Sequence, residues 1–210
     1  MNNYIEALKW RYATKKFDSS KKVAAEDLNI LKEAMQLSAS SYGLQPYKIF
    51  VIEDQEIRKQ LQPAAYGQSQ IVDASHLIVI ANKADFDENL VDSYVDEISK
   101  VRGIEPAQLS GMADYMKKNV VDLAVEMKAQ WTAKQSYIVL GNLLAAAAQL
   151  KIDTCPMEGF DAKKFNEILG LANNDYNASV IVALGYRSID DATQHLPKVR
   201  RPKEVLFETI

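Results

Sequence analysis

Hydrophobic and polar residues along this 210-residue chain follow two patterns. Apolar residues spaced three and four apart indicate amphipathic helices, and short unbroken apolar runs indicate buried strands. The helical pattern covers 4–10, 25–37, about 88–103, about 107–127, 131–150 and 161–169. The strand-like runs cover 48–53, 77–81 and 179–185. Because a run such as LIVIA has no polar side, these strands are expected to be covered on both faces.

Capping residues support several of these boundaries. Asn2 or Asn3 is expected to cap the first helix, and Asp161 to begin the last one, which should end at Gly170. The chain has no internal repeat, low-complexity tract or linker rich in Pro, Gly or Ser. The prediction is a single α+β domain over residues 1–210.

Composition narrows the classes of protein. Lys and Arg number 25 against 28 Asp and Glu, a net charge of −3, which argues against a dedicated nucleic-acid binder. One cysteine allows no intrachain disulfide, and two histidines with one cysteine allow no Cys/His-rich zinc site. There is no secretory leader, and the most apolar stretch, 137–150, is too short to span a membrane. We expect a cytoplasmic protein without a membrane partner. No metal-ligating residue is predicted, although composition alone leaves a carboxylate-based metal site open.

Common nucleotide and hydrolase motifs are absent. The eight glycines are too widely spaced for G-x-G-x-x-G or a P-loop, and there is no G-x-S-x-G, H-E-x-x-H or C-x-x-C. His76 and Cys155 are more typical of structural residues than of a base and a nucleophile. A nucleotide, if one is used, must therefore be held by another architecture.

Three segments have both a functional and a structural interpretation. Arg11–Lys16 could cradle a phosphate or be a solvated basic loop. The cations of Lys198–Arg201, stiffened by flanking prolines, could hold an anion or be ordinary surface. Pro156–Phe160 could bring backbone close to a ligand at Gly159 or be a simple turn between helices.

Taken in order, five motifs resemble the nitroreductase family of FMN-dependent NAD(P)H oxidoreductases. They are ALKWRYATKKFD, SASSYGLQPY, AYGQSQIVDASHLIVIA, WTAKQSYIVLGNLLAAAAQL followed by D-x-x-P-M-E-G-F-D, and LPKVRRP. They span essentially the whole chain and are most similar to oxygen-insensitive nitroreductases and dihydropteridine reductases. The resemblance implies an α+β fold with a mostly antiparallel sheet flanked by helices. It also implies an intertwined homodimer with C-terminal strand exchange and two interface FMN sites.

The resemblance also implies roles for individual residues. Cations would hold the FMN phosphate, Lys15 would lie near the ribityl chain, and two serines would reach the flavin from the partner subunit. The 156–159 turn would lie over the flavin and donate backbone N–H groups to it. The implied cofactor-binding set is Arg11, Tyr12, Ala13, Lys15, Ser40, Ser41, Gln68, Gln70, Gln135, Pro156, Met157, Glu158, Gly159, Lys198 and Arg200.

Some positions depart from the family pattern. Tyr12 and Ala13 replace a histidine and a serine, and Gly67 and Gln70 stand where an asparagine and a lysine are common. Gln68 or Gln70 could still hydrogen-bond the pyrimidine edge. A missing lysine would weaken stabilisation of anionic reduced flavin.

The expected activity is reduction of nitroaromatics or quinones by NADH or NADPH, in a ping-pong hydride transfer through flavin N5. The flavin performs the chemistry, so no catalytic side chain is expected. Two alternatives stay open: a non-catalytic flavin-binding module, and another flavin reaction such as dehalogenation or dehydrogenation. Residues 88–127, which match the family least well, would carry that difference.

Overall fold

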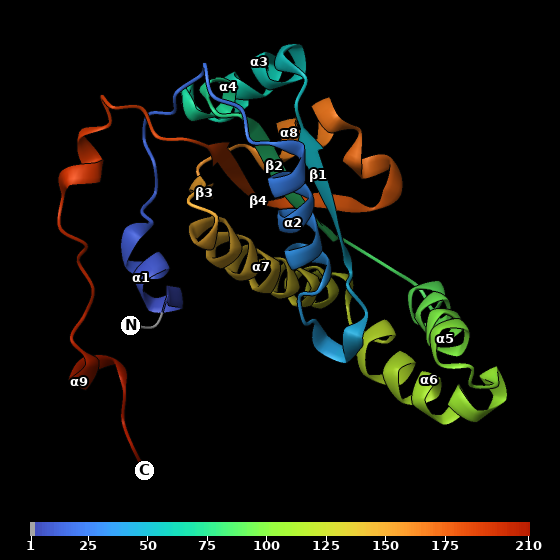
Figure 1. The fold of residues 1–210 in the computed structure, drawn as a ribbon. Helices are drawn as coiled ribbons and strands as arrows, with labels where there is room; N and C mark the ends of the chain where they lie inside the picture. Colours follow the sequence, from blue (N-terminus) through green and yellow to red (C-terminus); the bar gives the residue numbers. More distant parts are fainter. Residues whose placement is uncertain (1–2) are drawn as a thin grey trace.

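A computed structural model describes residues 3–210 (Figure 1). The cap expected at Asn2 lies outside the described residues. The α-helices are α1 (Asn3–Trp10), α2 (Ala25–Gln36), α3 (Gln55–Ala64), α4 (Gln70–Asp73), α5 (Asn89–Arg102), α6 (Ser110–Met116), α7 (Val125–Gln149), α8 (Ala162–Leu169) and α9 (Lys203–Leu206). Short helical turns are η1 (Ser41–Gly43), η2 (Pro106–Leu109), η3 (Lys117–Val121), η4 (Leu171–Asn174) and η5 (Ala192–His195).

The centre of the fold is a four-stranded antiparallel sheet in the order β1-β2-β4-β3. Its strands are β1 (Tyr47–Ile52), β2 (His76–Lys83), β3 (Asp153–Met157) and β4 (Tyr176–Gly185). The three predicted strands are confirmed, and so is the α+β architecture that the resemblance implied. The simple helix-to-helix turn considered for 156–160 is wrong in part, because Pro156 and Met157 end a strand.

Helices cover both faces of the sheet, as the unbroken apolar runs predicted (Figure 1). Ile78 and Ile80 of β2 point to the face covered by α2 and α7. Leu77 and Val79 point to the opposite face, where Leu61 of α3 belongs to the same buried cluster, together with α8 residues. Alternate residues of one strand therefore enter two separate cores.

The helix expected over 107–127 is interrupted. The chain there forms η2, α6 and the π-helical turn η3, and α7 begins at Val125. Ala124 before α7 has extended backbone (φ −59°, ψ 149°), so one continuous helix is impossible. Met116 and Val120 are buried in a third apolar cluster, against which Trp131 of α7 packs, so the broken chain folds back on itself.

Helices α5 and α6 extend away from the sheet, whereas α1 and the C-terminal segment lie on the opposite side of the molecule (Figure 1). Asp161 caps α8 by accepting from the Lys164 backbone N–H, and α8 ends at left-handed Gly170, both as predicted. Among the described residues, no helix combines the length and apolarity needed to cross a membrane.

Candidate functional site

The basic loop after α1 is built into the edge of the sheet. Ala13 pairs in parallel with Thr154 of β3, and the Thr14 backbone N–H donates to the Thr154 carbonyl (3.2 Å). On its other side Phe17 pairs with Arg187. Residues 13–17 therefore lie between β3 and the segment after β4, which is not the arrangement of a free solvated loop.

Asp191 fastens this loop to the C-terminal segment. Its buried carboxylate accepts from the backbone N–H groups of Lys15 (2.8 Å) and Lys16 (3.2 Å), from the Tyr12 hydroxyl (2.9 Å) and from the Thr193 N–H (3.0 Å). Burial raises the pKa of Asp191, but these hydrogen bonds outweigh burial and lower its pKa overall. Burial and the bond to Asp191 raise the pKa of Tyr12 to about 12, so its hydroxyl stays a donor.

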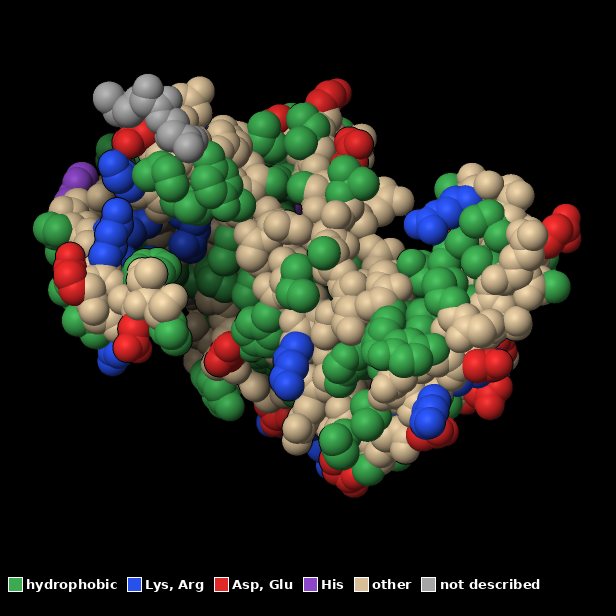
Figure 2. Space-filling view, turned by 90° about the horizontal axis from the view of Figure 1, so that it is seen from below, with side chains coloured by type: hydrophobic (Ala, Val, Ile, Leu, Met, Phe, Trp, Pro, Cys, Tyr) green, Lys and Arg blue, Asp and Glu red, His purple; other side chains and the backbone are tan. Residues whose placement is uncertain are grey.

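The first cationic motif and the last one meet in space. Arg11, Lys198 and Arg200 line two hollows of about 410 and 310 Å³ beside α1. Figure 2 shows Lys and Arg side chains gathered in a hollow at the left of the view. Lys198 Nζ donates to the Leu8 carbonyl (2.6 Å) and to the Arg11 carbonyl. These two bonds connect the C-terminal segment to α1.

These three cations have no acidic partner. Within residues 3–210, no carboxylate forms an ion pair with any of them, and Arg11 Nε is buried with no hydrogen-bond acceptor. Burial and the nearby Arg200 lower the pKa of Arg11, and burial, Arg11 and Arg200 lower that of Lys198. A bound dianion would relieve this repulsion, and bidentate guanidinium contacts suit a phosphate.

A second group of predicted residues surrounds the end of β3. The Glu158 carboxylate accepts from the Tyr137 hydroxyl of α7 (2.5 Å), and Gln68 Nε2 donates to the Gly159 carbonyl (2.8 Å). The bond to Glu158, together with burial, raises the pKa of Tyr137 to about 12. Gln70 is buried in α4. The turn after β3 is thus fixed from two sides, and a Cβ at Gly159 would meet only Gln68 Nε2, at 3.6 Å.

The predicted serines lie elsewhere. Ser40 and Ser41 are at η1, at the lower end of α2 in Figure 1 and away from β3. The Ser41 N–H donates to Gln135 Oε1 (2.9 Å), and Ser40 Oγ accepts from the Gln45 N–H (2.9 Å). One chain therefore presents two separate parts of the predicted site.

A model of the nitroreductase family, described as "Nitroreductase family", matches residues 8–186. The chain is 35% identical to a Staphylococcus haemolyticus protein whose name, SH0546, is given with the description NAD(P)H nitroreductase. The match covers 98% of this chain and 96% of that protein. It is 34% identical to the similarly named YfkO of Bacillus subtilis, over 95% and 94%.

The chain belongs to the nitroreductase family.

Solved structures agree with this family fold. A protein of Exiguobacterium sibiricum, described as an inferred nitroreductase in complex with FMN, has a TM-score of 0.83 at 20% identity and covers 100% of this chain and 98% of its own. An enone reductase of gut-bacterial fatty acid saturation has a TM-score of 0.82 at 18% identity, covering 100% and 99%. At these identities the likeness is one of fold.

Sequence patterns missed the residues that support the cationic hollow of this nitroreductase-family chain. Asp191 and Arg187 lie outside every motif that carried the resemblance, and Trp10 belongs to the first motif but had no predicted role. Asp153 was likewise part of a motif without a role. Their partners are more than 140 residues away in most cases, so no local spacing could have revealed them.

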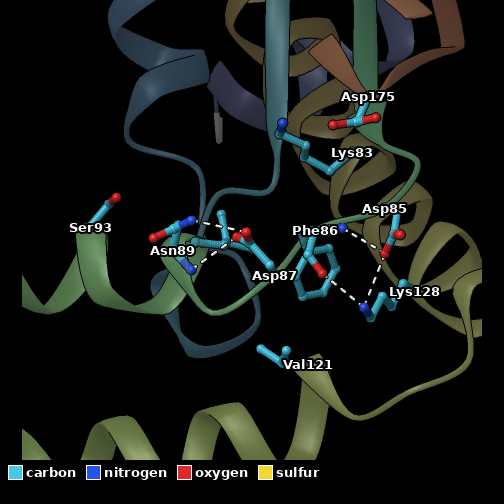
Figure 3. A pocket seen from close by; sticks show the side chains of 10 residues that line it. Lys83, Asp85, Phe86, Asp87, Asn89, Ser93, Val121, Lys128 and Asp175 are labelled. Atoms are coloured by element: carbon cyan, nitrogen blue, oxygen red, sulfur yellow. Dashed lines mark hydrogen bonds and ion pairs between the residues drawn. The ribbon is translucent and has the colours of Figure 1, made fainter.

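A larger cavity, of about 600 Å³, lies between β2, α5 and α7 (Figure 3). Three carboxylates, of Asp85, Asp87 and Asp175, line it beside its two lysines. Lys128 Nζ donates to Asp85 Oδ1 (3.0 Å) and to the Phe86 carbonyl (2.8 Å), and Lys83 Nζ donates to the Asn174 carbonyl (2.9 Å). None of the predicted cofactor-binding residues lines this cavity. With two lysines against three aspartates, this cavity does not favour an anion, in contrast to the hollow at Arg11.

Proposed function

We propose that this member of the nitroreductase family is an FMN-dependent oxidoreductase that uses NADH or NADPH to reduce nitroaromatic compounds or quinones. The observation that carries the proposal is the group formed by Arg11, Lys198 and Arg200, three converging cations without an acidic partner. Such a group suits a phosphate monoester on a chain that has no P-loop. The relatives' NAD(P)H nitroreductase names and the FMN complex of a family structure support the choice of cofactor and reductant.

The chain's own residues divide the work of binding. Arg11, Lys198 and Arg200 would hold the phosphate of FMN, and Lys15 would add positive charge beside the Ala13–Thr154 pairing. Backbone at Tyr12 and Ala13 would border the same end of the cofactor. The backbone of residues 13–16 is already held by the sheet edge and by Asp191, so this part of the site would need little reorganisation on binding.

The other end of the cofactor would lie at the turn after β3. Pro156, Met157 and Glu158 would line it, and the open backbone side of Gly159 would let the ring approach closely. Gln68 is held toward this turn by its bond to Gly159, and Gln70 lies in the next helix. With Gln70 in place of a lysine, less positive charge stabilises the reduced cofactor, so its potential should be low for the family.

Bound FMN would supply the redox chemistry, taking electrons from NAD(P)H and passing them to a small aromatic acceptor. The protein would bind, orient and exclude water, with no general base. His76 is unsuited to proton transfer at this site, since it is buried at the start of β2 and its Nδ1 lies 2.9 Å from Ser75 Oγ. Burial lowers the pKa of His76, which favours the neutral ring.

A homodimer would bring the separate parts of the site together. We propose that Ser40, Ser41 and Gln135 of one subunit complete the cofactor site of the other. The C-terminal tail, residues 202–210, would form the contact between the subunits, because its apolar residues Leu206, Phe207 and Ile210 are exposed.

The tail of one subunit would bind at the open edge of the sheet of the other. β1 is an edge strand, and beside it lies a groove of about 410 Å³ lined by Met35, Ile49 and Val51 together with Lys32 and Lys48. Apolar residues of the tail would fill the groove, and the acidic tail side chains would face the two lysines.

Steady-state assays test the proposed activity. FMN-loaded protein should oxidise NADH or NADPH continuously when a nitroaromatic or quinone is added, with parallel double-reciprocal lines for a ping-pong mechanism; without an acceptor, anaerobic oxidation should stop after one equivalent per flavin. Binding of FMN without any turnover would favour the non-catalytic flavin module. Turnover with an enone or a halogenated aromatic alone would favour another flavin reaction on this fold.

A further inference from the structure

Arg187 makes an unusual set of contacts at the border of the cationic hollow. Its Nε and Nη2 donate to Asp153 Oδ1 (2.9 and 2.5 Å), and its backbone N–H donates to Asp153 Oδ2 (2.8 Å). Asp153 is buried at the start of β3. Because three bonds from one residue meet one carboxylate, the guanidinium is fixed to the sheet.

The fixed guanidinium lies against two aromatic rings of the basic loop. Arg187 Cζ is 4.3 Å from the centroid of the Trp10 ring and 4.6 Å from that of the Tyr12 ring. Both distances are well inside the range of cation–π contacts. Lys151 Nζ lies 4.8 Å from the same Trp10 ring, so two cations hold that side chain.

Trp10 and Tyr12 are the two chain neighbours of Arg11. We propose that Arg187 is a positioning residue: by holding both rings, it fixes the backbone on either side of Arg11 and directs that guanidinium into the anion-binding hollow. The proposal rests on the proposed function, because it assigns Arg11 to the cofactor phosphate.

The side chain of Arg11 cannot set its own direction. Its Nε is buried without an acceptor, and the nearby cation of Arg200 repels it. Its backbone is held instead. Lys198 donates to the Arg11 carbonyl, and the residues before and after Arg11, Trp10 and Tyr12, are held by the stacking of their rings on Arg187. Loss of a ring contact would therefore free Arg11 to turn away from the hollow.

Paired titrations of the full-length apoprotein with FMN and riboflavin test this. Only FMN carries the phosphate, so the ratio of the two dissociation constants isolates the phosphate contacts. Trp10→Leu should weaken FMN binding about tenfold and riboflavin binding less than about twofold. Trp10→Phe keeps an aromatic face and should restore most of the FMN affinity. In an Arg11→Ala background, Trp10→Leu should not change the ratio further.

The results separate this inference from the proposed function. Equal weakening of both ligands by Trp10→Leu, or an unchanged ratio, would overturn the positioning role alone if Arg11→Ala still abolishes the preference for FMN. If wild-type protein shows no preference for FMN over riboflavin, both proposals fail. Should Trp10→Leu not fold, Arg187→Lys serves in its place, since it keeps the charge but loses the bidentate fork.

Discussion

Asp191 shows how one buried carboxylate can hold two distant segments together. It accepts four hydrogen bonds, three from the basic loop and one from Thr193. Replacing it with alanine removes the acceptor of four partly buried hydrogen bonds, and a bond to a charged group contributes about 1.5–3 kcal/mol when it is buried and less when it is partly exposed. We therefore expect Asp191→Ala to lower the free energy of unfolding in urea, and exposed Asp190→Ala, the matched control, to leave it nearly unchanged.

The lowered pKa of Asp191 also predicts a pH dependence with a definite sign. Its folded-state pKa lies below the ordinary value of an aspartic acid, about 3.9, so the stabilisation is complete above that pH and is lost as pH falls through the folded-state pKa. The gap in unfolding free energy between wild type and Asp191→Asn should thus be constant near neutral pH and narrow in acid. A gap that widens as pH falls would contradict the assignment.

Arg11 is the residue on which the anion site depends most. Arg11→Ala should weaken FMN binding by about ten- to a hundredfold, because a hydrogen bond to a charged group contributes about 1.5–3 kcal/mol. Lys16→Ala is the control, since this exposed lysine engages Asp191 only through its backbone. Flavin fluorescence titration measures both. Equal losses for the two variants would mean that net charge, rather than the Arg11 contact, holds the phosphate.

At the scale of elements, Arg58 joins α3 to the chain that leads into β2. Its fully buried guanidinium donates to the carbonyls of Ile71 (2.7 Å), Ser75 (3.1 Å) and Ala74. Arg58→Ala should lower the unfolding free energy by at least about 2 kcal/mol, because buried carbonyls lose their donors. Lys59→Ala, at an exposed site on the same helix, should change it by less than about 1 kcal/mol. Similar melting temperatures for the two variants would refute this role.

The elements that the sequence predicted best are those whose own residues decide their structure. LIVIA and SVIVALG are apolar without interruption, and they form the core of β2 and β4. β3 was not predicted because two of the five residues of DTCPM, Asp153 and Pro156, are typical of loops. Its strand structure comes from pairing with β4. The break before α7 lies where Val120 and Trp131 join one apolar cluster, a tertiary arrangement that no local period reveals.

At the scale of the whole molecule, the exposed tail predicts a quaternary structure. Removal of residues 202–210 should convert a dimer to a monomer in sedimentation experiments, because the apolar tail would no longer reach a second subunit. Glu208→Gln, which removes one proposed ion pair but no apolar contact, should weaken the dimer only slightly, by less than about 1 kcal/mol. A truncated protein that remains dimeric and keeps its flavin would show that the tail is not the dimer contact.

The site illustrates the limit of sequence reasoning at the same scale. The cations at the two ends of the chain were identified by family resemblance, and the fold brings Arg11, Lys198 and Arg200 together. Ser41 and Gln135 form their own cluster elsewhere, so their predicted role requires a second chain. The structural roles of Asp191 and Arg187 could not be predicted, because contacts between segments far apart in the sequence leave no local pattern.

The visible absorption spectrum of the purified protein, before and after anaerobic addition of NADPH, tests the central claim most directly. We predict flavin bands that disappear on reduction and return when a quinone is added. NADH should be tried in parallel, because either nucleotide satisfies the claim. A colourless protein that takes up no added FMN, or flavin bands that neither nucleotide bleaches, would contradict it.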